Sequence, residues 1–265
     1  MKNLAVIIIV LAILALAFYL GSRNRPTGQP AITTPLPEQP EKNSPSVAQK
    51  IPSPQPAVIG TERAAVAVLL PDLDQSDAMV REELAGLSAD AQLEQLFTFE
   101  SAIRRFVVIV DNLTAAKLPQ KFRFTRPPQD KFQVQHATDG GDYIAPANYE
   151  RYTPYVRFIE DLDITRTAAL YHKLYPLLQQ AYAELGYPDR RFNDRVLEVI
   201  DHLLASPAVT GPVKLLQPSV YYTYADENLE ALSSGQKLLL RIGPANASKV
   251  KGWLLRLRGA LVTGK

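Results

Sequence analysis

The sequence contains no cysteine and only three histidines among its 265 residues. The absence of cysteine excludes disulfide bonds, thiolate metal sites, a cysteine nucleophile and a lipid-bearing cysteine near the N-terminus. It fits reducing and oxidising compartments equally, so it does not locate the protein. The formal net charge is only +2, which is too small to indicate a polyanionic partner, and we expect no nucleic acid to bind.

The sequence also lacks the short motifs that mark several large enzyme classes. It has no G-x-S-x-G, no phosphate-binding glycine loop and no H-E-x-x-H, so it offers no nucleophile elbow, no nucleotide cradle and no zinc helix. We therefore predict no catalytic residue, no cofactor and no metal site, and we regard an enzyme as the less favoured class.

One pair of residues has the spacing of metal ligands. His202 follows Glu198 by one helical turn, and Arg195 precedes Glu198 by three residues, so on a helix the three share a face. Glu198 and His202 would need His172 or an acid as a third ligand. We favour a solvated, charge-paired stripe opposite the apolar face, because no other residues show ligand spacing.

Two groups of acids raise the question of glycoside hydrolysis, which uses two carboxylates at a set separation in a cleft. Acids are also routine at helix starts and on exposed helix ends, so we favour helix-start acids for the first group and surface acids near a helix end for the second. The groups are Asp72, Asp74 and Asp77, and Glu160, Asp161 and Asp163.

A long apolar run lies near the start of the sequence. No charge interrupts the 17 positions from Leu4 to Leu20, which as a helix extend roughly 25 Å, near the lower limit for crossing the hydrocarbon core of a bilayer. The alternative is a signal peptide cleaved after Ala17. Because the apolar run continues past that site and two arginines then follow, we favour a retained transmembrane anchor over residues 1–22.

The orientation of this anchor is weakly encoded. Lys2 and the α-amino group on one side nearly balance Arg23 and Arg25 on the other, so the positive-inside rule is close to a tie. A short tail ahead of a large domain is the layout of a signal anchor, which exports the domain on its C-terminal side. We therefore expect a single-pass membrane protein with its globular domain on the exported side of the membrane.

Proline dominates the next segment, residues 23–60, which holds nine of the 21 prolines. Prolines at this density remove backbone donors and fix φ, so we expect neither helix nor sheet but a disordered linker. Fully extended as polyproline II it would reach on the order of 120 Å, and as a coil roughly 30 to 40 Å. Either length holds the following domain away from the bilayer.

Residues 61–265 carry the apolar periodicity of a folded domain. We predict one predominantly helical domain with a small β-hairpin in which "FQVQH" and "DYIA" flank an Asp-Gly-Gly turn. The β-branched run inside "ESAIRRFVVIVDNLTAA" suggests a strand, but its length favours a buried helix. The other predicted helices are "DAMVREELAGL", "ADAQLEQLF" capped by Ser88, "ANYERYTPYVRFIEDL" broken or kinked at Pro154, Thr165 to Gly186 bent at Pro176, Asn193 to Ala205, short helices near Asn228 and Gly235, and Ala245 to Leu261.

Two aromatic or apolar stripes are assigned to the core of this domain. Tyr171, Tyr175 and Tyr182 recur at helical spacing, which favours packing over an exposed platform for sugars or a partner. The stripe of the last helix could lie on an anionic bilayer, but we favour docking of the helix onto its own domain. That stripe comprises Val250, Trp253, Leu254, Leu257 and Leu261.

The segment "KFRFTR" alternates cations with rings. As a strand it would place Lys121 and Arg123 on one face and two phenylalanines on the other, and Arg126 follows. One interpretation is an anion-binding surface with stacking aromatics. The other, which we prefer, is a core-facing phenylalanine pair with solvated cations. If the domain binds a partner, these three cations are our candidate contact residues.

Five blocks together resemble a known family. They are "LPDLDQSDAMVREELAGLS", "IRRFVVIVDNL", "YHKLYPLLQQAYAELGYP", "VIDHLLASP" and "LLLRIGPANA". In this order they resemble the bacterial family catalogued as domain of unknown function 3014, over about Leu70 to Leu261. The resemblance implies a bacterial envelope protein with an N-terminal hydrophobic segment and a proline-rich stretch. It implies no activity, cofactor or catalytic residue.

The sequence leaves three functional hypotheses. The first is a membrane-anchored binding or scaffold module for an envelope protein or cell-wall polymer. The second is an envelope hydrolase that acts on cell-wall polymer through an acid pair. The third is a tethered regulator that faces the cytoplasm. The missing motifs favour the first.

Overall fold

The computed structural model describes residues 70–86, 96–123 and 125–263. The predicted anchor (1–22), the predicted linker (23–60) and nearly all of the predicted helix after Ser88 lie outside these residues. Within the described ranges, no helix combines the length and the apolar character that a membrane span requires.

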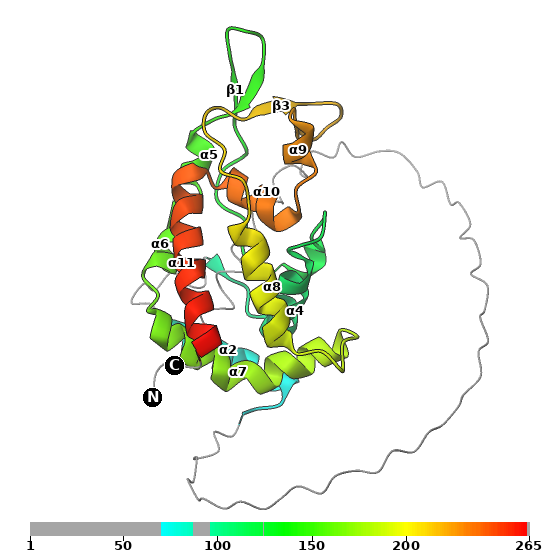
Figure 1. The fold of residues 1–265 in the computed structure, drawn as a ribbon, viewed down its shortest axis with the longest axis vertical. Helices are drawn as coiled ribbons and strands as arrows, with labels where there is room; N and C mark the ends of the chain where they lie inside the picture. Colours follow the sequence, from blue (N-terminus) through cyan, green and yellow to red (C-terminus); the bar gives the residue numbers. More distant parts are fainter. Residues whose placement is uncertain (1–69, 87–95, 124, 264–265) are drawn as a thin grey trace, which may run out of the picture. The chain divides into compact units, whose positions relative to one another are not determined.

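The described part is mainly helical, as predicted, and a small antiparallel sheet lies at one end of the helical body (Figure 1). In Figure 1, α7 runs across the opposite end, and α8 and α11 extend from it toward the sheet. In chain order the helices are η2 (Leu73–Gln75), α2 (Asp77–Ala85), α4 (Ala102–Asn112), η3 (Gln120–Phe122), α5 (Ala147–Glu150), α6 (Thr153–Glu160), α7 (Ile164–Glu184), α8 (Phe192–Leu204), α9 (Glu227–Glu230), α10 (Ser234–Arg241) and α11 (Pro244–Thr263).

Helix α4 is the centre of the main core, where it packs against α7 and α8. Its β-branched run is buried, and Phe106, Val107 and Val110 are fully shielded from solvent. Burial on several faces stabilises the helix more than the unfavourable propensity of β-branched residues destabilises it. The prediction of a buried helix here is therefore confirmed.

The last helix docks onto its own domain, as predicted. Helix α11 packs against α6, α7 and α8, and all five residues of its stripe are buried. Trp253 is completely shielded, and its Nε1 donates to the carbonyl oxygen of Leu162 at 3.3 Å. Tyr171 and Tyr182 are buried in the same core, and Tyr175 is packed at its edge, which confirms the assignment of these tyrosines to packing.

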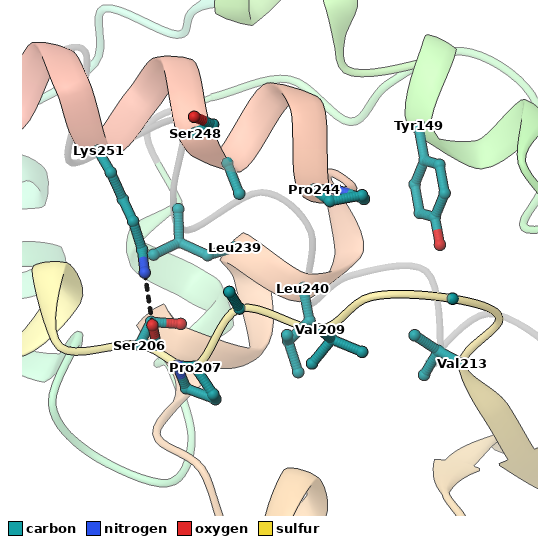
Figure 2. Close-up of a pocket in the computed structure, with 13 residues that line it drawn as sticks. Tyr149, Ser206, Pro207, Val209, Val213, Leu239, Leu240, Pro244, Ser248 and Lys251 are labelled. Carbon is teal, nitrogen blue, oxygen red and sulfur yellow. Dashed lines mark hydrogen bonds between the residues drawn. The ribbon is translucent and has the colours of Figure 1, made fainter.

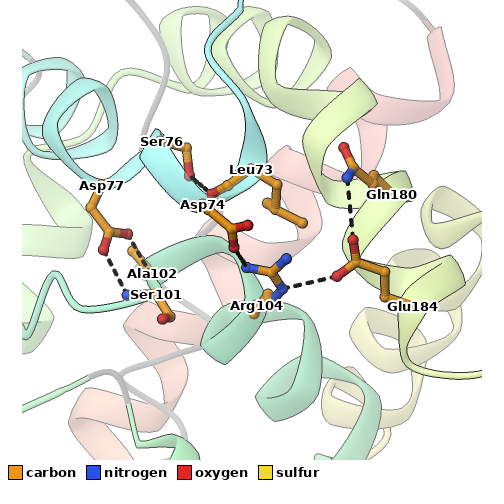
Figure 3. Close-up of polar contacts among 9 residues, drawn as sticks. All are labelled: Leu73, Asp74, Ser76, Asp77, Ser101, Ala102, Arg104, Gln180 and Glu184. Atoms are coloured by element: carbon orange, nitrogen blue, oxygen red, sulfur yellow. Dashed lines mark hydrogen bonds and ion pairs between the residues drawn. The ribbon is translucent and has the colours of Figure 1, made fainter.

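The start of α4 is held by a side chain from α2 (Figure 3). Asp77 accepts hydrogen bonds from the backbone N–H groups of Ser101 (2.7 Å) and Ala102 (2.8 Å). Ser101 has a positive φ of 51°, so the chain turns sharply there and points both groups at the carboxylate. Nearby, Arg104 joins Asp74 to Glu184 of α7, which ties three segments together.

The N-terminal cap of α7 lies two residues earlier than predicted. The prediction that Thr165 caps this helix is wrong, because the Asp163 carboxylate accepts from the Arg166 N–H at 2.7 Å. The helix ends as predicted at Gly186, where φ is +113° and the Tyr187 N–H reaches back to the Tyr182 carbonyl, a glycine-based C-terminal cap. It continues through Pro176, and the predicted bend there stays a prediction.

The predicted hairpin is present as β1 (Val134–His136) and β2 (Asp142–Ile144), with Gln135 opposite Tyr143. Two further strands, β3 (Lys214–Leu216) and β4 (Thr223–Tyr224), extend it to a four-stranded antiparallel sheet in the order β1-β2-β3-β4. The prediction of a hairpin alone is therefore incomplete. The sheet covers a second small cluster of buried residues, Ile144, Val213, Leu215, Tyr224 and Leu240.

The predicted break at Pro154 is confirmed. The helical stretch after Pro146 is divided into α5 and α6, and Pro154 lies in the first turn of α6. Proline is tolerated there because the N–H groups of a first turn have no partner within the helix. The division matters for function, since the α5–α6 corner contributes side chains to two hollows in the surface, one polar and one apolar.

Candidate functional site

The three cations predicted as a binding surface lie on one segment between α4 and β1. Lys121, in η3, and Arg126 are exposed, and Arg123 is half-buried. The segment is not a continuous strand: it begins with η3, and only an isolated bridge pairs Thr125 with Phe97. The expected alternation of cations and rings on the two faces of a strand is therefore wrong.

A side chain of α4 explains the turn. Arg105 Nη1 donates to the carbonyl oxygens of Lys121 (3.0 Å) and Arg123 (3.3 Å). Both bonds come from one nitrogen, so this guanidinium braces the segment at two residues. Lys121 Nζ lies 4.8 Å from the ring centroid of Phe122, whereas Phe124 lies outside the described residues, so the predicted phenylalanine pair is untested.

A polar groove of about 550 Å³ starts where this segment ends. Arg126 directly precedes its first proline, and the Arg126 carbonyl accepts from the Tyr155 hydroxyl at 3.1 Å. Burial raises the pKa of Tyr155 to about 12, so the phenol stays a neutral donor at ordinary pH. The groove is lined by Leu96, Pro127, Pro128, Gln129, Asp130, Gln133, Ala147, Glu150, Arg151, Pro154 and Tyr155.

Arg151 fixes the shape of this groove. Its Nε donates to the Gln129 carbonyl at 2.9 Å, and its Nη2 donates to the Asp130 carbonyl at 2.6 Å. Asp130 has a positive φ of 65°, a conformation that needs such support in a residue other than glycine. The guanidinium therefore holds the loop wall of the groove against the α5–α6 corner.

Four of the six acids considered for hydrolysis have structural contacts. Asp77 lies in the first turn of α2, as predicted, and its carboxylate accepts from the N-terminus of α4. Asp163, predicted as a surface acid near a helix end, instead caps the start of α7. Asp74 pairs with Arg104, and Glu160 pairs with Lys249 at 2.8 Å. Carboxylates engaged in this way hold helices together, and no pair of them lines the polar groove or the apolar hollow.

The residues with metal-ligand spacing also have other partners. His202 Nε2 lies 2.8 Å from Ser233 Oγ, and Glu198 pairs with Arg195 at 2.8 Å. The prediction that Arg195 lies on a solvated face is wrong. Its side chain is only 17% exposed and bonds to Asp111 of α4 at 2.9 Å. Across the described ranges, no group of three or more histidine and acidic side chains is placed to hold a metal.

The second hollow, smaller and apolar, lies between α5, the loop after α8, α10 and the start of α11 (Figure 2). Its volume is about 180 Å³. Val209, Val213 and Leu240 give it an apolar wall, and Tyr149 closes one side. Its remaining lining residues are Ser206, Pro207, Ala208, Gly211, Leu239, Pro244, Ala247, Ser248 and Lys251.

Lys251 brings a charge to this apolar hollow. Figure 2 shows its side chain extending from α11 to the chain just after α8, where Nζ donates to the Ser206 carbonyl oxygen at 2.5 Å. Burial lowers the pKa of Lys251, because an ammonium group loses hydration in an apolar setting. Ser206 is only 5% exposed, and its Oγ has no hydrogen-bond partner among the described residues.

Sequence reasoning missed this hollow. It singles out neither Lys251 nor Ser206. The one available signal was the position of Lys251 beside Val250 on the edge of the apolar stripe. Ser206 lies 45 positions earlier along the chain from Lys251, and nothing in local spacing joins the two.

Comparison with known proteins gives one match. A family described as "Protein of unknown function (DUF3014)" matches residues 102–258, which is more than half of the chain. The match agrees with the resemblance inferred from the sequence blocks, although the first block lies before the matched residues. No curated protein and no solved structure matches the chain.

Proposed function

The chain belongs to the DUF3014 family, whose function is unknown, and from this premise we propose that it is a single-pass protein of the bacterial inner membrane whose helical domain is a tethered binding module. The observation that carries the proposal is the order of three segments in the sequence. An apolar run of membrane-spanning length is followed by a proline-rich stretch and then by a folded domain. This order suits a domain that reaches a partner away from the bilayer.

The cationic segment and its neighbouring groove support the choice of contact surface. Lys121 and Arg126 are exposed, and the groove beside them is walled by three prolines and Tyr155. Prolines and a braced arginine give a surface that loses little conformational entropy when it is covered. We propose that this surface contacts an envelope protein or a cell-wall polymer, with Lys121, Arg123 and Arg126 at its edge.

The six acids named from the sequence lend hydrolysis no support, although Asp130 and Glu150 line the polar groove. A retaining or inverting glycosidase holds two carboxylates about 5 to 9.5 Å apart across the scissile bond. Four of the six acids considered for that role bond to helix ends or to cations. The proposal therefore rests on a recognition surface rather than on an acid pair.

Site-specific crosslinking in cells tests the contact surface. A photo-reactive amino acid in place of Lys121 should give a crosslinked adduct with an envelope component. The matched control is the same amino acid in place of Arg256, an exposed cation on α11, which should give none. Equal adducts at both positions, or adducts only with a second copy of the chain, would contradict the proposed surface.

A fusion experiment tests the side of the membrane. A reporter that is active only in the periplasm, fused after Lys265, should be active when the full chain is expressed. A reporter that works only in the cytoplasm should be inactive at the same position. The reverse pattern would favour the tethered cytoplasmic regulator instead.

A further inference from the structure

The hollow beside Lys251 contains two polar groups whose bonding is incomplete. Other shielded lysines pair with carboxylates: Lys173 pairs with Glu83 at 2.7 Å and Lys237 pairs with Glu230 at 2.5 Å. Lys251, in contrast, bonds to a neutral carbonyl oxygen, and no carboxylate among the described residues pairs with it. A partly buried cation without a counter-ion is costly, so an anion that reached it would be favoured.

Ser206 adds a second, independent feature. Its side chain is buried, its Oγ has no hydrogen-bond partner among the described residues, and the residue lines the same hollow. Because the Oγ is shielded from solvent, the side chain must rotate about χ1 to present the hydroxyl to a ligand in the hollow. An unsatisfied buried hydroxyl destabilises the fold, and an acceptor that entered the hollow would recover part of that loss. A carboxylate has enough acceptor sites to bond both the ammonium and the hydroxyl.

The rest of the hollow selects an apolar body. Its other lining residues are mostly apolar, among them Val209, Val213 and Leu240, and Tyr149 and Ser248 are the exceptions that carry hydroxyls. Its volume of about 180 Å³ is slightly larger than an apolar cavity of about 150 Å³ that is known to accept benzene. One aromatic ring or a short branched chain therefore fits, and a long acyl chain does not.

We propose that this hollow binds a small monocarboxylate with an apolar body of about one ring, with the carboxylate bonded to Lys251 Nζ and Ser206 Oγ and the body against Val209, Val213 and Leu240. The site is independent of the macromolecular contact proposed above. A Ser-Lys hydrolase dyad would require Lys251 Nζ to hydrogen-bond the Ser206 hydroxyl as its general base. Here Nζ bonds to the backbone carbonyl oxygen of Ser206 instead, so we assign a binding site.

Isothermal titration of the full-length protein in mild detergent tests this proposal with three matched probes. They are phenylacetate, the neutral alcohol 2-phenylethanol and the cation 2-phenylethylamine. Phenylacetate should bind saturably and at least tenfold more tightly than the alcohol, and the amine should bind most weakly. Equal affinity for phenylacetate and the alcohol, or no saturable binding of phenylacetate at millimolar concentration, would overturn the proposal.

Two variants assign the contacts. Lys251→Met keeps the approximate length of the side chain. It should weaken the binding of phenylacetate at least tenfold and change the binding of the alcohol little. Ser206→Ala should weaken phenylacetate about two- to tenfold, as expected for one hydrogen bond. Lys249→Met is the control, because Lys249 lies on the same helix but pairs with Glu160 outside the hollow. If Lys251→Met fails to fold, the order of the three probe affinities for the wild-type protein decides whether the proposal stands.

Discussion

Replacement of Asp77 by alanine should destabilise the domain by about 2 kcal/mol, because this one carboxylate caps α4 across the α2–α4 contact. It accepts from two backbone N–H groups, at 2.7 Å from Ser101 and 2.8 Å from Ala102. Ser101 is exposed and its N–H can turn to water, but Ala102 is fully buried. The stranded N–H of Ala102 is therefore the main cost, about 1 to 3 kcal/mol, which agrees with the range for lost helix caps.

The assay is thermal denaturation of the full-length protein in mild detergent, followed by far-UV circular dichroism. For a domain of this size, about 2 kcal/mol corresponds to a fall in Tm of roughly 4 to 8 °C. Asp77→Asn keeps one acceptor oxygen and should lose about half as much. Asp72→Ala, in the same acidic group but with no capping hydrogen bond, should change the stability by less than about 0.5 kcal/mol. If Asp77→Ala behaves like Asp72→Ala, the capping argument is wrong.

Three further perturbations test other contacts by the same assay. Gly243→Ala should cost about 2 kcal/mol or more, because Gly243 has a φ of +85° and an added Cβ would lie 2.5 Å from the Tyr149 ring. Asp111→Ala should cost about 2 kcal/mol, because the partly buried Arg195 guanidinium loses its shielded carboxylate partner and keeps the more exposed Glu198; a cost below about 1 kcal/mol would contradict this. Burial lowers the pKa of His202 below its usual 6.5, with a further contribution from Arg195, so the unfolded chain takes up this proton first and stability should fall as pH drops below about 6.5. His202→Gln should flatten that part of the stability profile, and an unchanged profile would count against the assignment.

The helices could be predicted from the sequence because their apolar spacing is local. Helix α8 is predicted over Asn193 to Ala205 and spans Phe192 to Leu204, and the stripe of α11 identifies its buried face. For the run around Val107 the length of the pattern decides, since β-branched residues by themselves favour a strand. Its burial between α7 and α8 confirms the prediction of a helix.

The rest depends on partners that are distant in the chain. Strand β3 is three residues long and pairs with β2 about 70 residues earlier, so neither its length nor its pattern marks it as part of the hairpin sheet. The prediction of Thr165 as the cap of α7 failed because Asp163, two residues earlier, has an equally suitable side chain. The segment from Lys121 to Arg126 alternates like a strand, yet Arg105 of α4 bends it.

The candidate site was predictable only in part. Lys121 and Arg126 are exposed as cations on a binding surface must be, but that they bind a partner is a proposal. The hollow at Lys251 was not predictable, because α5, the loop after α8, α10 and α11 each contribute a few side chains to it. A cavity of this kind exists only in the folded arrangement, and no motif encodes it.

Protease treatment of intact spheroplasts tests the tethered-module account most directly, with the domain followed by an antibody against residues 70–263. The account predicts that the domain sediments with membranes before treatment and is released as a soluble fragment after cleavage within residues 23–60. If the domain still sediments with membranes after protease treatment because the membrane shields it from the protease, it lies in the cytoplasm. A domain that is already soluble before protease is added would show that residues 1–22 do not anchor it.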